Sequence, residues 1–295
     1  MKKASPLPTV SKNIFPAVAR LAVRHAQQMG TLLRSLLAGN TYQPERVHQL
    51  RILSRKCAAA WSVLKLINPS TVPDKALRVL RSLRRKFSKL RDADIRLALL
   101  QEHTRKPDSE LTAALLHDWH CHYQKVINQV RSKAERYFRA FKELQEQGKS
   151  AYQTATTSTW KKRHQRWLHQ QSLPCQISGK SLSAESLHEF RLATKRWRYL
   201  LQTVYPAKDN SPAAKLLNDL TAIQDALGRQ RDINQLLGWL IPLQQSLSHQ
   251  VNASRSLHRY METLRRWCLV ELKRLEKQIN KTCQQWLSQS SSARS

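Results

Sequence analysis

The sequence VHQLRILSRK occupies residues 47–56 and returns in altered form 140 residues later, as LHEFRLATKR at residues 187–196. A second pair of segments follows at the same offset, KLRDAD at 89–94 and RQRDIN at 229–234. Because the offset does not change, the chain between the two motifs has one length in both halves. We therefore predict an internal duplication, with repeats at 1–150 and 151–295.

Apolar residues around these motifs recur in steps of three and four, which is the spacing of one helix face. They include Leu77, Leu80, Leu83, Phe87 and Leu90 in the first half and Leu257, Met261, Leu264, Cys268, Leu272, Leu275 and Ile279 near the end. The chain has only 6 Gly, where average usage would give about 20. We expect an all-α fold of long antiparallel helices, with helix ends at Pro- or Gly-rich segments such as 206–212 and 238–242.

The repeated motif places cations on one helix face. At 100° per residue, His48, Arg51 and Arg55 lie within about 60° of one another. The second copy repeats this face with His188, Arg191 and Lys195 and extends it to Arg198, while Lys56 and Arg196 lie on the flank. Guanidinium groups bind phosphate oxygens in pairs and Lys adds a mobile charge, so phosphate is the ligand that this pattern favours.

The following helix carries a second basic stripe, opposite its apolar face. It comprises Arg78, Arg81, Arg85, Lys89 and Arg96. Asp92 lies among these cations, where it could orient Arg96 or an Arg of a facing helix, and Asp232 could do the same in the second half. We therefore expect both carboxylates to support the cations and not to contact the ligand.

Charge over the whole chain agrees with an anionic partner. The formal net charge is +31, with +18 in the first 150 residues and +13 in the rest. Such a surplus costs self-repulsion unless a polyanion neutralises it. Inorganic polyphosphate and the RNA or DNA backbone are both candidates at this point.

These paired motifs resemble those of the CHAD domain (conserved histidine α-helical domain) family, and the resemblance covers residues 12–290. It implies two four-helix bundles related by a pseudo-twofold axis, with a basic groove between them that binds polyphosphate, and association with polyphosphate granules. The first copy has Cys57-Ala58-Ala59 where the second has Trp197-Arg198-Tyr199, so its last cation is missing. The expected polyphosphate contacts are His48, Arg51, Arg55, Lys56, Arg81, Arg85, Lys89, Arg91, His188, Arg191, Lys195, Arg196, Arg198 and Arg231.

Other classes of protein fit the sequence poorly. We find no nucleophile elbow, zinc-protease motif, phosphate-binding loop or paired carboxylates, so we expect a stand-alone, non-catalytic binding protein without a cofactor. His117, His120, Cys121 and His122 have metal-ligand spacing, but ligands on one helix need partners elsewhere, and we expect no metal. Without a signal peptide or a long apolar stretch, we expect a cytoplasmic protein. Nucleic-acid backbone binding remains the alternative function.

Overall fold

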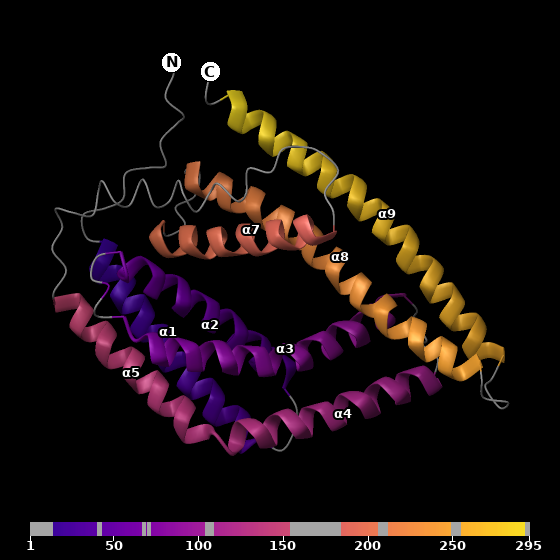
Figure 1. Cartoon of the computed structure of the whole chain (residues 1–295), viewed down its shortest axis with the longest axis horizontal. Helices are drawn as coiled ribbons and strands as arrows, with labels where there is room; N and C mark the ends of the chain where they lie inside the picture. The colour runs from indigo at the N-terminus through magenta and orange to yellow at the C-terminus, as the bar shows by residue number, and fades with distance from the viewer. Residues whose placement is uncertain are drawn as a thin grey trace.

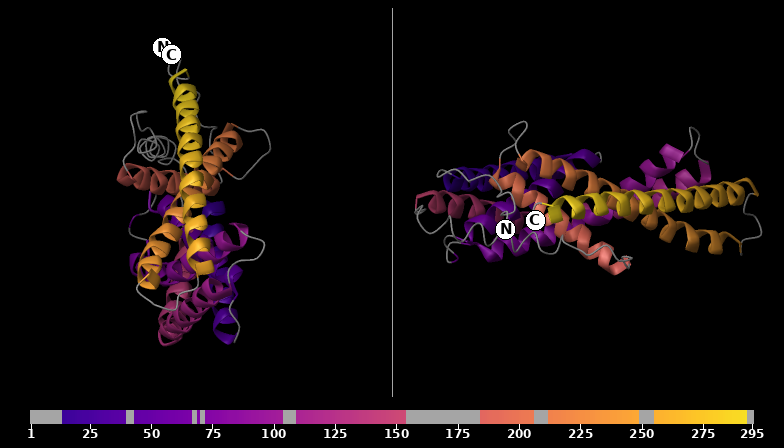
Figure 2. Two further views of the ribbon diagram at one scale, coloured as in Figure 1. Left: turned by 90° about the vertical axis from the view of Figure 1, so that its right-hand side faces the viewer. Right: turned by 90° about the horizontal axis from the view of Figure 1, so that it is seen from above.

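The computed structural model describes residues 14–39, 43–66, 69, 72–103, 109–153, 184–205, 212–248 and 255–292. Within these ranges the chain is all-α, with eight helices and no strand. None of these helices is both long and apolar enough to cross a membrane. The helices form an elongated molecule, as the view from above shows (Figure 2).

The described part of the first half contains five α-helices, α1 (Ile14–Ala38), α2 (Pro44–Leu64), α3 (Asp74–His103), α4 (Ser109–Arg131) and α5 (Ala134–Gln153). α1 packs against α2 and α5, and α3 packs against α2, α4 and α5. Pro44 and Asp74 begin their helices, as expected of a residue with a fixed φ and of an acidic residue near the positive end of the helix dipole. The helices of this half lie together in Figure 1.

The described part of the second half contains three helices, α7 (Ala184–Val204), α8 (Pro212–Ser248) and α9 (Arg255–Ser292). α7 begins and ends 140 residues after α2, and both helices have 21 residues. α2 packs against α7, and α3 packs against α8. The two motif-bearing helices of one half therefore contact those of the other half.

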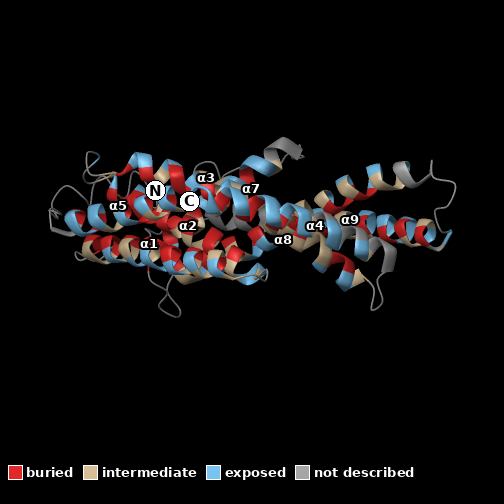
Figure 3. Ribbon diagram, turned by 90° about the horizontal axis from the view of Figure 1, so that it is seen from below, coloured by how far each residue is buried: buried red, intermediate tan, exposed pale blue. Residues whose placement is uncertain are grey.

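Two hydrophobic cores hold the molecule together. The first is built on α1, whose Phe15, Val18, Ala22 and Met29 are buried at helical spacing, and it continues through α2, α3 and α5 into α7 and the first part of α8. The second lies between the end of α3, the later part of α8 and α9. Figure 3 shows the buried residues as stripes along the helix faces. The first core therefore contains residues from both halves of the chain, and α8 contributes to both cores.

One predicted helix end is wrong. α7 ends at Val204 and α8 begins at Pro212, as expected, but α8 then runs through the 238–242 segment with Pro242 inside the helix. Leu237 and Leu240 pack in the second core on either side of the exposed Gly238. Tertiary packing therefore outweighs the cost of a helical proline. A second helix end was not predicted: α4 and α5 are separated at Ser132 and Lys133, where no Pro or Gly marks the break.

Candidate functional site

The two copies of the basic motif lie on contacting helices. α2 carries His48, Arg51 and Arg55, and α7 carries Arg191 and Lys195. Arg51 and Arg55 both influence the protonation of Lys195, and Arg55 also influences Arg191. The structure therefore brings cations from both halves of the chain into one site.

The RD motifs of α3 and α8 meet beside this site. Arg231 Nη2 donates a hydrogen bond to Asp92 Oδ1 at 3.1 Å, which joins residues from the two halves. The sequence left two partners open for Asp92, which were Arg96 and an arginine of a facing helix. In the structure the partner is Arg231 of the facing helix α8. Arg91 Nη1 lies 4.0 Å from Asp94 Oδ2, and Arg231 Nη1 lies 4.0 Å from Oδ1 of the neighbouring Asp232.

Together these residues form one electrostatically coupled group, which we call the cation cluster. Positive charge exceeds negative charge in it: its carboxylates are Asp92 and Asp232, and Glu45 of α2 acts on it only through His48. Its members come from α2, α3, α7 and α8: His48, Arg51, Arg55, Arg84, Arg91, Asp92, Arg191, Lys195, Arg198, Arg231 and Asp232.

Arg51 is the most deeply buried cation of the cluster. It is only 7% exposed, and its buried Nε has no hydrogen-bond partner within the described part of the chain. Burial, and then the charge of Arg55, lower the pKa of Arg51 to about 10, while Asp92 opposes that effect. The side chain stays charged at neutral pH, with a donor left unsatisfied.

Lys195 is the most strongly perturbed amine of the cluster. Burial lowers its pKa to about 7, and the neighbouring charges of Arg55, Arg191, Arg51 and Arg198 act in the same direction. An approaching anion would reverse this effect, because it favours the ammonium form. Lys195 is therefore poised to change its protonation near neutral pH.

The two motif histidines differ in their surroundings. His48 is half-buried, and burial together with Arg91 lowers its pKa, with Glu45 opposing. His188 is exposed on α7. The repeat of the sequence motif thus does not give the two histidines equivalent environments.

Burial also acts on the second carboxylate of the cluster. It raises the pKa of Asp232, although Arg231, Arg191 and Arg91 act to lower it. Arg191 in turn has its pKa lowered, first by burial and then by Arg231. These opposing effects are those of a site where positive charges are crowded and partly removed from water.

Several predicted contacts lie outside the centre of the cluster. All of Arg81, Arg85, Lys89 and Arg196 are exposed, and Arg81 and Arg85 affect the cluster through Arg84. Lys56 lies elsewhere, on the wall of a cavity beside His25. Whether these five residues bind a ligand remains a prediction.

Arg84 belongs to the cluster although the sequence motifs did not predict it as a phosphate contact. Burial, Arg55 and Arg81 lower its pKa, and Tyr199 of α7 acts in the other direction. Arg84 precedes Arg91 by seven residues, two helical turns on the same face, and this spacing could have identified it.

In the described part of the chain, potential metal ligands do not gather into one group. Among the residues that the structure describes, no group of three or more His, Cys, Asp or Glu side chains is arranged to hold a metal ion. The cluster instead offers guanidinium and ammonium donors, which suit anionic oxygen atoms.

Comparisons with known proteins give one consistent result. The CHAD domain model matches residues 17–241. The crystal structure of the CHAD domain from the plant Ricinus communis superposes with a TM-score of 0.67 at 22% identity, covering 96% of this chain and 95% of that one. PptA from Streptomyces chartreusis superposes with a TM-score of 0.64 at 12% identity, covering 93% and 99%. No curated protein matches the sequence. The chain belongs to the CHAD domain family.

Proposed function

We propose that this protein binds inorganic polyphosphate without cleaving it, and that the cation cluster holds the polyanion. The family is associated with polyphosphate binding and is generally non-catalytic. The observation that carries the proposal is the convergence of Arg51, Arg55, Arg191 and Lys195 from two helices that lie 140 residues apart in the sequence.

Binding would relieve the repulsion that the empty cluster carries. Successive phosphoryl groups accept hydrogen bonds from guanidinium and ammonium donors, and the counterions condensed on the polyanion are released. Arg51 and Arg198 each keep a buried Nε that has no hydrogen-bond partner among the described residues, which adds to the cost of crowding these cations. Asp92 and Asp232 hold the arginines in place and limit the repulsion.

We further propose that α2 and α3 are related to α7 and α8 by an internal duplication with a pseudo-twofold axis. The equal lengths of α2 and α7 support this relation, as do the contacts of α2 with α7 and of α3 with α8. The counterpart of α1 would fall at 154–178, outside the described residues. The boundaries at 1–150 and 151–295, a cytoplasmic location and an association with polyphosphate granules belong to the same proposal.

Nucleic acid is the weaker candidate ligand. Proteins that bind single strands stack bases on exposed aromatic rings. The aromatic residues within the motif helix α7 are Phe190, Trp197 and Tyr199, which are 2%, 6% and 6% exposed, so they offer no such platform. The cluster provides charge without base recognition.

The test is calorimetric titration with long-chain polyphosphate of the wild-type protein and of the double variant Arg55→Gln/Arg191→Gln. The control is Lys142→Gln/Lys277→Gln, which removes the same charge from exposed positions. We expect the cluster variant to lose at least about tenfold in affinity, and the control to lose much less. Equal losses would mean that binding follows net charge and that the cluster is not the site.

A further inference from the structure

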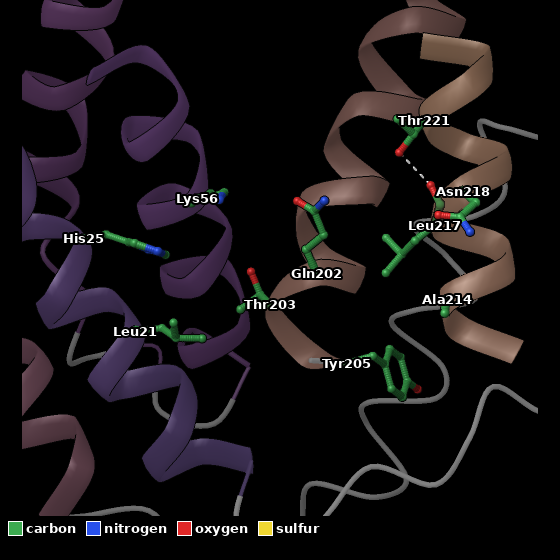
Figure 4. Close-up of a pocket in the computed structure, with 10 residues that line it drawn as sticks. All are labelled: Leu21, His25, Lys56, Gln202, Thr203, Tyr205, Ala214, Leu217, Asn218 and Thr221. Carbon is green, nitrogen blue, oxygen red and sulfur yellow. Dashed lines mark hydrogen bonds between the residues drawn. The ribbon is translucent and has the colours of Figure 1, made fainter. Parts of the chain in front are cut away.

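A cavity of about 530 Å³ lies outside the cation cluster. It is lined by α1, α2, the end of α7 and the beginning of α8, and none of its described lining residues belongs to the cluster (Figure 4). Its volume lies in the range of small-molecule sites, about 300 to 1,000 Å³. The cavity is therefore large enough for a metabolite but is separate from the proposed polyphosphate site.

One side of the cavity is electropositive. Lys56 and His25 line it, and the described lining includes no Asp or Glu. Lys56 has no ion-pair partner within the described part of the chain. Its ammonium group is thus available to an anionic group of a ligand.

His25 adds an imidazole ring to the same side of the cavity. Its Nδ1 is buried and has no hydrogen-bond partner among the described residues, and its ring points into the cavity in Figure 4. Burial lowers the pKa of His25 to about 4, helped by the charges of Lys56 and Arg24, so the ring is neutral at physiological pH. A neutral imidazole can donate one hydrogen bond and accept another, which suits a hydroxyl group.

The remaining wall is polar but uncharged. Gln202 of α7 and Asn218 of α8 present side-chain amides to the cavity (Figure 4). Thr203 and Thr221 donate their hydroxyl protons to the carbonyl oxygens of Tyr199 and Leu217, each at 2.7 Å, which leaves their oxygen atoms as acceptors. These groups match hydroxyls better than further anionic groups.

We propose that this cavity binds a small hydroxylated solute carrying one anionic group, of the class of sugar phosphates. Lys56 binds the anionic group, and His25 with the amides of Gln202 and Asn218 binds the hydroxyls. Polyphosphate fits poorly there, because a chain of many charges would meet one ammonium group. The cavity is thus a second ligand site, independent of the cation cluster.

The test uses glucose 6-phosphate as the probe, with glucose and inorganic phosphate as comparison compounds. Titrations are made on the full chain after saturation with long-chain polyphosphate, so that the cation cluster is already occupied. We expect glucose 6-phosphate to bind, and each comparison compound to bind more weakly. Lys56→Gln should weaken binding by about tenfold, the loss of one charge-assisted hydrogen bond.

Lys65→Gln is the matched control, because it removes the same charge from an exposed position at the end of α2. It should leave the affinity unchanged. Asn218→Leu, which changes no charge, should also weaken binding, and circular dichroism checks that each variant is folded.

Several results would overturn the proposal. These are no binding of glucose 6-phosphate up to about 10 mM, complete displacement of the probe by polyphosphate, and equal affinities for the wild type and Lys56→Gln. Equal binding of glucose would remove the need for an anion, and equal binding of inorganic phosphate would remove the need for hydroxyls. Displacement by polyphosphate would place that ligand in the cavity as well. The other results have no bearing on polyphosphate binding at the cluster, which the titration of its own variants tests.

Discussion

Arg231 donates a hydrogen bond to Asp92 at 3.1 Å, so the arginine of the second RD motif is held by the aspartate of the first. The pair joins α3 to α8, and both side chains are partly buried, with 32% and 24% exposed. Asp92 also counteracts the crowding of positive charge around Arg51 and Arg191. This single contact therefore links the packing of the two halves to the electrostatics of the cluster.

Replacing Asp92 should destabilise the empty protein. Asp92→Asn removes the charge that holds Arg231 and leaves more repulsion in the cluster, so we expect the free energy of unfolding to fall by about 1 to 2 kcal/mol. Urea denaturation at low salt measures this change. Asp225→Asn, an exposed site on α8, is the control. Saturating polyphosphate should shrink the difference, since its phosphoryl groups replace the lost charge; equal effects of the two substitutions would argue against a role for the ion pair.

Arg55 occupies the most connected position in the cluster. Its charge affects His48, Arg51 and Arg84 on its own side, and Arg191 and Lys195 on α7. We expect Arg55→Gln to weaken polyphosphate binding about five- to tenfold near 150 mM salt. The salt dependence of the affinity should correspond to the release of about one ion fewer than in the wild type. Lys142→Gln on α5 serves as the comparison, and a loss there as large as in Arg55→Gln would show that position does not matter.

The lowered pKa of Lys195 predicts how polyphosphate binding depends on pH. Its pKa is about 7 in the empty protein, and a bound polyanion raises it, so the complex holds more protons than the free protein above pH 7. Affinity should therefore fall as the pH rises from about 7 to 9, with proton uptake on binding. His48, whose pKa is lowered in the empty protein, adds a further gain in affinity at more acidic pH.

The matched variants are Lys195→Arg and Lys195→Gln, titrated between about pH 6 and 9 in buffers of different ionisation enthalpy. Arg keeps its charge throughout and should give strong binding with little dependence above pH 7, whereas Gln should give weaker binding with the same flat profile. A wild-type slope retained in both variants would assign the titration to another group.

Pro242 lies inside α8, where it removes one backbone hydrogen bond. Pro242 and Gly238, four residues earlier, are both exposed, so nothing in the core needs the proline ring. Pro242→Ala should raise the free energy of unfolding by about 1 to 3 kcal/mol, as measured by chemical denaturation. An unchanged or lower stability would indicate that α8 is broken at this point in solution.

Much of the architecture could be predicted from the sequence because the repeated motifs lie in helices of equal length. The 140-residue offset anticipated α7 from α2, and the cation spacing anticipated that His48, Arg51 and Arg55 share a face. The break before Pro212 was also visible, because proline and its neighbours end helices.

The rest depended on how helices pack, which local patterns do not contain. Lys56 follows Arg55 in the chain, but the helix turns its side chain toward α1 and His25. Arg84 enters the cluster because α3 faces α2 and α7, and Arg231 meets Asp92 because α8 faces α3. The cavity beside His25 is formed by four helices from both halves, and no single segment indicates it.

We expect the cation cluster to select polyphosphate over other polyanions. Competition tests this selectivity most directly: the protein is titrated with long-chain polyphosphate in about 150 mM salt, with RNA and double-stranded DNA of matched charge as competitors. We expect tight polyphosphate binding that neither nucleic acid displaces at equal charge concentration. Displacement by RNA or DNA at similar concentrations would contradict this expectation, and would mean that the cation cluster is a general site for phosphate backbones.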